Sequence, residues 1–305
     1  MIRGGTLQRA TRRAAHYARE GLYYGRVAAL GLVSNVTRRG TPIYDRDWDA
    51  MVVLDACRPD MLAAAEPDYD FLADGRETRS VASYSKNWMR WNFSRRYARE
   101  MAETVYVTAN PFSGEVLDGE DFAHLEEVWR YDWDRTEGTV LPRPVTDRAI
   151  EHARERDPER LIVHYMQPHH PFLGDDTEGF APGAFPDPKT ADPWDQVRWG
   201  QRDAEAVLDA YRENLRHALE DVDLLLENID ADRVVITADH GNAVGERGIY
   251  GHPAYAGIDA IRRVPWYVTS TTDAGTYHPQ AVETRSRSGT PGTEVNARLS
   301  QLGYV

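Results

Sequence analysis

Cysteine and lysine are nearly absent from this chain of 305 residues. The single cysteine, Cys57, excludes a disulfide within the chain and a zinc site built from several thiolates. Lysine occurs only as Lys86 and Lys189, so 34 of the 36 basic residues are arginine. With 49 acidic residues, the formal net charge is −13. An acidic surface with arginine in place of lysine is typical of a high-salt (halophilic) cytoplasm, where salt screens the self-repulsion.

Long hydrophobic runs are also missing. No run approaches the roughly 20 apolar residues that a membrane-spanning helix needs, and the apolar piece 27–33 lacks the small-residue cleavage site of a secretory signal. We therefore expect a cytoplasmic protein without a signal peptide or a transmembrane segment. The acidic balance also argues against nucleic acid as a partner, because nucleic-acid binding needs a basic face.

Positive charge is concentrated at the N-terminus. Residues 1–40 contain eight arginines and one acid, Glu20, for a net charge of about +7, and the remainder carries about −20 (28 basic against 48 acidic residues). The spacing of apolar residues predicts a helix over 6–33 within a basic helical arm, 1–42. This arm could lie on an anionic membrane surface, at the inner face of the membrane. It could equally contact an acidic partner or cover the acidic flank of its own domain.

Strand-like and helix-like stretches alternate along the rest of the chain, in which 41% of all residues are hydrophobic. This order predicts a three-layer α/β/α sandwich with a largely parallel central sheet, formed by a catalytic domain over 43–270. We expect strands at 49–55, 104–108, 160–166, 234–238 and 264–268, and helices at 56–65, 87–99, 145–156 and 203–228. The stretch 111–142 is expected to be loop, 173–200 an inserted rim, and 271–305 a polar tail with a short helix near 295–302.

Acidic and histidine side chains follow two of the expected strands. Asp55 comes directly after the first, and Asp239 and His240 follow 234–238. Open α/β sheets bind ligands beyond the carboxyl ends of their strands, and a carboxylate–imidazole pair suits a divalent metal. Each side chain alone could merely cap a turn or pack beneath it. Two acids at strand tips in one chain favour a shared site, close to the glycine-rich stretch that ends at His252.

Serines and histidines supply further candidates. Ser83 and Ser85 precede an aromatic helix, where a hydroxyl is most often a cap but where a nucleophile would also benefit from the positive helix end. Ser85, nearest to the helix, is the preferred candidate and Ser83 is the reserve. His169 and His170 lie between prolines at a third strand end, which favours contact with a ligand.

Three stretches together resemble the alkaline phosphatase superfamily, within it the sulfatase and phosphoglycerol-transferase branch: MVVLDACRPD, MQPHHPF, and ITADHGNAVGERGIYGHP with the following VPWYV. The resemblance spans roughly 50–268 and implies the alkaline phosphatase fold. It also implies that Asp55, Asp239 and His240 bind a metal, and that Ser85 both touches this metal and attacks the substrate.

The same resemblance implies substrate contacts. His169 and His252 would hold the transferring oxyanion or protonate the leaving oxygen, and Arg58, with His170, would bind the substrate. Cys57-Arg58-Pro59 lacks the ending of the Cys-x-Pro-x-Arg motif of formylglycine sulfatases, so no formylglycine is expected. The Asp-x-x-x-His pair of two-metal phosphatases is also missing from the core, which leaves one divalent metal: Mn, Zn, Mg or Ca.

The activity implied is a metal-dependent hydrolysis of sulfuric or phosphoric esters through a serine nucleophile. The substrate would be an anionic ester, free or linked to a glycan or lipid. One alternative is a transferase that moves phosphoglycerol or another phospho-alcohol onto a glycan or lipid at the membrane surface. A second is a non-catalytic module that binds the metal only.

Overall fold

The computed structural model describes residues 3–37, 40–174 and 192–280, together with Asn296, Arg298, Leu299 and Leu302. Most of the rim expected at 173–200 therefore lies outside the described residues. The short helix expected near 295–302 also lies mostly outside them, although Asn296, Arg298 and Leu299 are helical.

The helices and strands alternate along the chain much as the sequence predicts. The longer helices are α1 (Arg3–Thr37), α2 (Pro59–Ala65), α3 (Ser85–Asn92), α6 (Pro142–Arg156), α7 (Pro193–Arg198) and α8 (Ala204–Leu226); the short ones are α4 (Ala98–Ala102), α5 (Ser113–Val116) and α9 (Asp259–Arg262). The strands are β1 (Ala50–Leu54), β2 (Arg76–Arg79), β3 (Thr104–Thr108), β4 (His124–Glu127), β5 (Arg160–Tyr165), β6 (Ala231–Thr237), β7 (Ala243–Val244), β8 (Tyr250–Gly251) and β9 (Arg263–Thr271).

Within the described residues, seven strands form one sheet in the order β2-β9-β6-β1-β5-β3-β4. The pairs β6–β1, β1–β5, β5–β3 and β3–β4 are parallel, and β9 runs antiparallel to both of its neighbours, β6 and β2. Every residue of β1 and β3 is buried, as expected for apolar strands that are covered on both faces of a parallel sheet. The carboxyl ends of β1, β5, β3 and β6 consequently meet at one edge.

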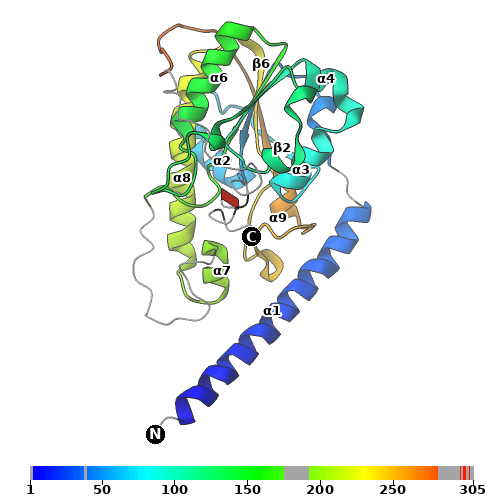
Figure 1. Cartoon of the computed structure of the whole chain (residues 1–305), viewed down its shortest axis with the longest axis vertical. Helices are drawn as coiled ribbons and strands as arrows, with labels where there is room; N and C mark the ends of the chain where they lie inside the picture. The colour runs from blue at the N-terminus through cyan, green and yellow to red at the C-terminus, as the bar shows by residue number, and fades with distance from the viewer. Residues whose placement is uncertain are drawn as a thin grey trace.

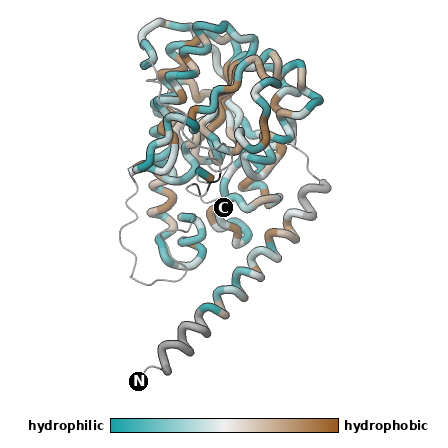
Figure 2. Tube along the Cα trace, in the orientation of Figure 1, coloured by the Kyte–Doolittle hydropathy of each residue, from teal (hydrophilic) through white to brown (hydrophobic). Residues whose placement is uncertain are grey.

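Helices cover both faces of this sheet (Figure 1): α6 and α8 pack together on one side, and α3 and α4 lie on the other. Apolar segments gather in the middle of the body (Figure 2), where one large buried cluster includes Trp48, Met89 and Ile162. The predicted α/β/α sandwich with a largely parallel sheet is therefore confirmed.

The sequence analysis did not predict two of the strands, β2 and β4. Neither β2, with the sequence RETR, nor β4, with HLEE in the expected loop, has the apolar pattern of a strand, because both lie at sheet edges where water satisfies polar side chains. The helix expected at 87–99 is also wrong in its bounds. It begins at Ser85, breaks after Asn92 and resumes as α4.

The N-terminal helix α1 projects beyond the body (Figure 1). Its later turns contact the domain: Val27 is buried in a small cluster with Ala243, Ile249 and Ile258. Glu20 pairs with Arg198 of α7 at 2.6 Å. Among the described residues, no helix is both long and apolar enough to cross a membrane. The role of residues 1–42 as an arm, like the limits of the catalytic domain, stays a prediction.

Gly241 offers a test of how tightly the loop after β6 is packed. Its N–H donates to the carbonyl oxygen of Ile261 at 2.7 Å, and a Cβ atom here would lie 2.5 Å from the carbonyl oxygen of Ala260. Because both neighbours are backbone, Gly241→Ala must displace the chain, and we expect it to lower the free energy of unfolding by about 1–3 kcal/mol. Urea denaturation measures this. Gly119→Ala is the control, since its methyl group would meet only Leu125 Cβ, at 3.9 Å; equal losses in both variants would contradict the prediction.

Candidate metal and nucleophile site

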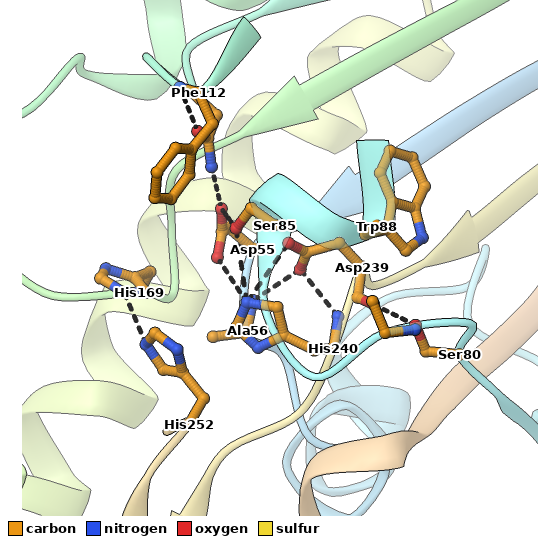
Figure 3. Close-up of polar contacts among 12 residues, drawn as sticks. Asp55, Ala56, Ser80, Ser85, Trp88, Phe112, His169, Asp239, His240 and His252 are labelled. Carbon is orange, nitrogen blue, oxygen red and sulfur yellow. Dashed lines mark hydrogen bonds and ion pairs between the residues drawn. The ribbon is translucent and has the colours of Figure 1, made fainter. Parts of the chain in front are cut away.

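The tips of two adjacent parallel strands bring three predicted residues together. Asp55 follows β1, while Asp239 and His240 follow β6, and all three side chains are fully buried. His240 Nε2 lies 3.3 Å from Asp239 Oδ2 and 3.6 Å from Asp55 Oδ1. Figure 3 shows the three groups converging on one point. Their ligand atoms all lie within 4.8 Å of one another.

Ser85 completes this group. It is the first residue of α3, directly after the N-cap residue Tyr84. Its Oγ donates to Asp55 Oδ2 at 3.1 Å and lies 3.4 Å from His240 Nε2 (Figure 3). Ser83, the reserve nucleophile, lines a neighbouring cavity. The geometry therefore favours Ser85 over Ser83, and a role beyond capping.

The backbone directly after β1 orients the carboxylate of Asp239. Ala56 adopts a left-handed conformation (φ 62°) that is costly for a residue with a Cβ atom. In this conformation its N–H donates to Asp239 Oδ1 at 3.0 Å, and the N–H of His240 donates to the same oxygen at 2.8 Å. Ser80 Oγ donates to the carbonyl oxygen of Asp239. The Asp239 carboxylate is thus fixed with its second oxygen, Oδ2, turned toward His240.

Two partners of Asp55 were not predicted. Asn110 Nδ2 donates to Asp55 Oδ2 at 2.7 Å, and Asn110 Oδ1 accepts the N–H of Phe112 at 2.9 Å. His164 Nε2 lies 3.5 Å from the same carboxylate oxygen, and Tyr106 OH lies 2.8 Å from His164 Nδ1. Asn110 could have been found, because it follows the expected strand at 104–108. His164 could not, because it is one residue within an apolar strand.

The arrangement fits a divalent cation. Among the described residues, Asp55 Oδ1 and Asp239 Oδ2 are buried side-chain atoms without a hydrogen-bond partner. Leaving such oxygens unsatisfied is costly, and a bound cation would satisfy both. His240 Nδ1 lies 2.9 Å from the carbonyl oxygen of Gly241. If Nδ1–H donates there, Nε2 presents its lone pair to the same point, as in most histidine metal ligands.

The electrostatics of the two carboxylates differ. Burial alone would raise the pKa of Asp55, but the hydrogen bond with His164 and the nearby imidazoles of His169 and His240 hold it well below its usual range. Burial, followed by the charge of Asp55, raises the pKa of Asp239. One carboxylate therefore stays ionised while the other resists ionisation, so the pair attracts a cation that would neutralise both.

The histidines predicted to contact the substrate lie beside this point. His169 Nε2 and His252 Nε2 are 2.8 Å apart, and the rings of His252 and His240 are 4.6 Å apart (Figure 3). Burial, then the neighbouring His170, lowers the pKa of His169 to about 4. Burial and the surrounding imidazoles lower the pKa of His252 well below its usual value. Both rings are therefore neutral at pH 7, and one donates its N–H to the other.

The remaining two predicted residues are engaged elsewhere. Arg58 forms ion pairs with Asp60 at 2.8 Å and with Glu246 at 2.7 Å, and donates to the carbonyl oxygen of Asn242. His170 stacks on His169 but turns toward Asp192, 3.8 Å away. The structure therefore brings Asp55, Ser85, Asp239, His240, His169 and His252 together, and places Arg58 in a separate ionic network.

No family model and no curated protein matches the sequence. Solved structures do match. The soluble domain of lipooligosaccharide phosphoethanolamine transferase A from Neisseria meningitidis has 12% identity and a TM-score of 0.47, with 88% of this chain and 92% of that chain covered. A sulfatase candidate from Bacteroides thetaiotaomicron has 12% identity and a TM-score of 0.47, covering 76% and 65%. A protein in the alkaline phosphatase superfamily from Vibrio parahaemolyticus has 10% identity and a TM-score of 0.38, covering 92% and 75%.

Identities of 10–12% and TM-scores below 0.5 assign neither a superfamily nor an activity to this chain.

The raised pKa of Asp239 leads to a testable prediction. Its folded-state pKa lies above the usual 3.8, so the folded chain holds this proton to higher pH than the unfolded chain. The carboxyl therefore reduces stability increasingly as the pH rises above about 4. In metal-free protein at pH 7, we expect Asp239→Asn to raise Tm by a few degrees, since the amide oxygen can still accept from Ala56 and His240.

With added zinc or manganese, the wild type should have a higher Tm than Asp239→Asn, because a cation bound by the wild type stabilises only the folded state. Differential scanning fluorimetry with EDTA and with added metal measures both Tm values. A variant less stable than the wild type in EDTA would contradict the electrostatic reasoning. Equal metal-induced shifts in both proteins would contradict the metal site.

Proposed function

We propose that this chain is a metal-dependent enzyme that cleaves or transfers phosphoric or sulfuric esters through a serine nucleophile. One observation carries the proposal: the hydroxyl of Ser85 lies between Asp55 and His240, at the point where two buried carboxylate oxygens have no hydrogen-bond partner among the described residues. A bound metal would therefore lie within a few ångströms of the proposed nucleophile.

The proposed ligands are Asp55, Asp239 and His240, with Ser85 as the fourth. A divalent cation, when bound, lowers the pKa of the serine hydroxyl and neutralises charge on the ester. One imidazole among three oxygen ligands favours zinc or manganese over calcium, which prefers an all-oxygen shell. Asn110 and the N–H groups of Ala56 and His240 hold the carboxylates in place.

The proposed reaction has two displacements at phosphorus or sulfur. The Ser85 alkoxide attacks in line, forms the serine ester, and breaks the bond to the leaving alcohol. One imidazole of the His169–His252 pair takes up the proton that Ser85 loses, and the imidazolium so formed hydrogen-bonds the transferring group and passes this proton to the leaving oxygen. Water or an acceptor alcohol then attacks the serine ester, which restores the hydroxyl of Ser85.

A neighbouring cavity supports a substrate larger than a simple ester. It has a volume of about 1170 Å³ and reaches Ser83, two residues from the proposed nucleophile. Arg90, Trp91 and Tyr255 line it. Exposed aromatic faces beside a guanidinium suit a sugar or lipid head group that carries negative charge. We propose that the alcohol part of a glycan- or lipid-linked ester lies here.

The two serines supply a matched test of the chemistry. Ser85→Ala removes the proposed nucleophile, so hydrolysis of aryl phosphate, phosphodiester and sulfate esters with added manganese or zinc should fall by about 10³-fold or more. Ser83→Ala removes a buried hydroxyl from the same turn and should retain activity within about tenfold. Mass spectrometry of the acid-quenched enzyme should find the transferred group on the peptide that contains Ser85.

Equal activity of Ser85→Ala and wild type would contradict this assignment. Binding of metal without turnover of any ester, by a wild-type protein that is fully folded, would favour the non-catalytic metal-binding module instead.

The alternative, a transferase that acts at a membrane surface, is favoured by α1. Arginines occur along this helix, including Arg13 and Arg19. Tyr17 is 64% exposed and Leu22 is 77% exposed, so both large side chains are accessible to a lipid surface. A helix with exposed apolar residues among arginines suits an anionic lipid surface. Such a surface would supply the acceptor alcohol in place of water.

This surface can be tested without disturbing the fold. We expect the full chain to sediment with vesicles that contain anionic lipid and not with vesicles of neutral lipid. Arg13→Gln with Arg19→Gln should weaken this binding roughly tenfold or more, because each arginine contributes about 1 kcal/mol near an anionic surface. Arg212→Gln, which changes an exposed arginine of α8, is the control. Equal binding to both kinds of vesicle, or equal binding by the variants, would contradict the membrane role.

A further inference from the structure

A second group of metal-ligating side chains lies at the far edge of the sheet. His124 and Glu126 are two residues apart on β4, so both side chains point to the same face of the strand. His152, near the end of α6, faces them. His124 Nε2 and His152 Nε2 lie 3.0 Å and 3.1 Å from the same atom, Glu126 Oε2, and the two rings are 4.5 Å apart.

This group is separate from the site at Asp55. Its strand, β4, is three positions from β1 in the sheet, or about 14 Å at the usual strand spacing. The two groups also differ in height along the sheet. His124 pairs with Val105 near the start of β3, whereas Asp55 follows the carboxyl end of β1. A ligand bound at one group cannot therefore contact the other.

The spacing of the three atoms suits a metal ion. Ligands at about 2.0–2.1 Å from a tetrahedral zinc ion lie about 3.3 Å from one another. The two observed separations of 3.0 and 3.1 Å differ from this by only a few tenths of an ångström, so an ion can enter with small side-chain movements. All three ligand atoms already lie within 4.8 Å of one another.

Neighbouring groups orient the carboxylate. Tyr131 OH donates to Glu126 Oε1 at 2.9 Å, which leaves Oε2 directed at the imidazoles. Burial would raise the pKa of Glu126, but hydrogen bonds with His152, His124 and Tyr131 hold it at about 2. The carboxylate is therefore ionised and ready to bind a cation at any physiological pH.

The guanidinium of Arg156 must move when a metal ion binds to His152. Arg156 Nε donates to His152 Nδ1 at 3.1 Å, and an imidazole that binds a metal through Nε2 carries its proton on Nδ1. Arg156 would lose this acceptor when a metal binds. Since Arg156 is exposed, its guanidinium can turn into solvent, which also moves its charge away from the ion.

We propose that His124, Glu126 and His152 form a second metal site, selective for zinc or another transition ion that accepts imidazole. Two imidazoles disfavour calcium and magnesium, which prefer oxygen ligands. Three protein ligands leave a fourth position for water. The ion would tie the edge strand β4 to α6 and so protect the polar edge of the sheet from fraying. This site is independent of the proposed enzymatic function.

The number of bound ions tests this proposal in the full-length protein. After removal of metal with a chelator and dialysis against dilute zinc, we measure the zinc-to-protein ratio by mass spectrometry. Glu126→Gln keeps the shape of the side chain and should lose one equivalent of the zinc that the wild type binds. His124→Asn, at a partly exposed position, should lose the same equivalent. Glu127→Gln is the control, because Glu127 instead contacts Ser113 and Arg130, and it should bind as much as the wild type.

A second readout separates this site from the first. With cobalt in place of zinc, the absorption bands of a four-coordinate His₂Glu site should appear in Asp239→Asn and disappear in Glu126→Gln. Folding of each variant is checked by circular dichroism. Unchanged zinc content and cobalt spectra in both Glu126→Gln and His124→Asn would overturn the proposal and identify the group as a hydrogen-bonded cluster only. Loss of zinc in Asp239→Asn alone would overturn it too, while leaving the site at Asp55 in place.

Discussion

Two buried carboxylates at the tips of neighbouring strands are the constraint on which the rest of the site depends. Asp55 and Asp239 are fully buried, with their ligand atoms within 4.8 Å of each other. Like charges in such a place repel strongly, because little water is present to screen them. Hydrogen bonds and nearby imidazoles offset part of this repulsion, and two carboxylate oxygens still have no hydrogen-bond partner among the described residues, which a bound cation would satisfy.

The fold maintains this unfavourable arrangement by fixing the backbone around it. Adjacent parallel pairing of β1 and β6 sets the two acids side by side. The left-handed Ala56 and the close approach of Gly241 to the Ala260 carbonyl then leave the loops little freedom. Stability lost at the acids is offset by the large apolar core beneath them. Such strained, polar and buried sites are where proteins place chemistry.

The two proposed metal sites, at Asp55 and at Glu126, differ in burial and in the role that we propose for the ion. At Asp55 the side chains are buried and supported by Asn110 and His164, as a site for precise positioning requires. At Glu126, two of the side chains, His124 and Glu126, are partly exposed on an edge strand, and His152 is a buried residue of α6. An ion at the second place would hold two elements together, whereas an ion at the first would activate Ser85.

The sequence alone determined the α/β/α order and located Asp55, Ser85, Asp239 and His240 at strand or helix ends, because periodicity and residue type are local properties. Its glycine and proline residues likewise marked the loops. Only the tertiary structure placed Ser85 beside Asp55 and His240, paired Arg58 with Glu246, and revealed Asn110, His164 and the cluster of His124, Glu126 and His152. These depend on contacts between residues far apart in the chain, such as the bond from Ala56 to Asp239, 183 positions away. The local pattern of residue types cannot specify which side chains come into contact, since the strand order and register are set by the packing of the whole core.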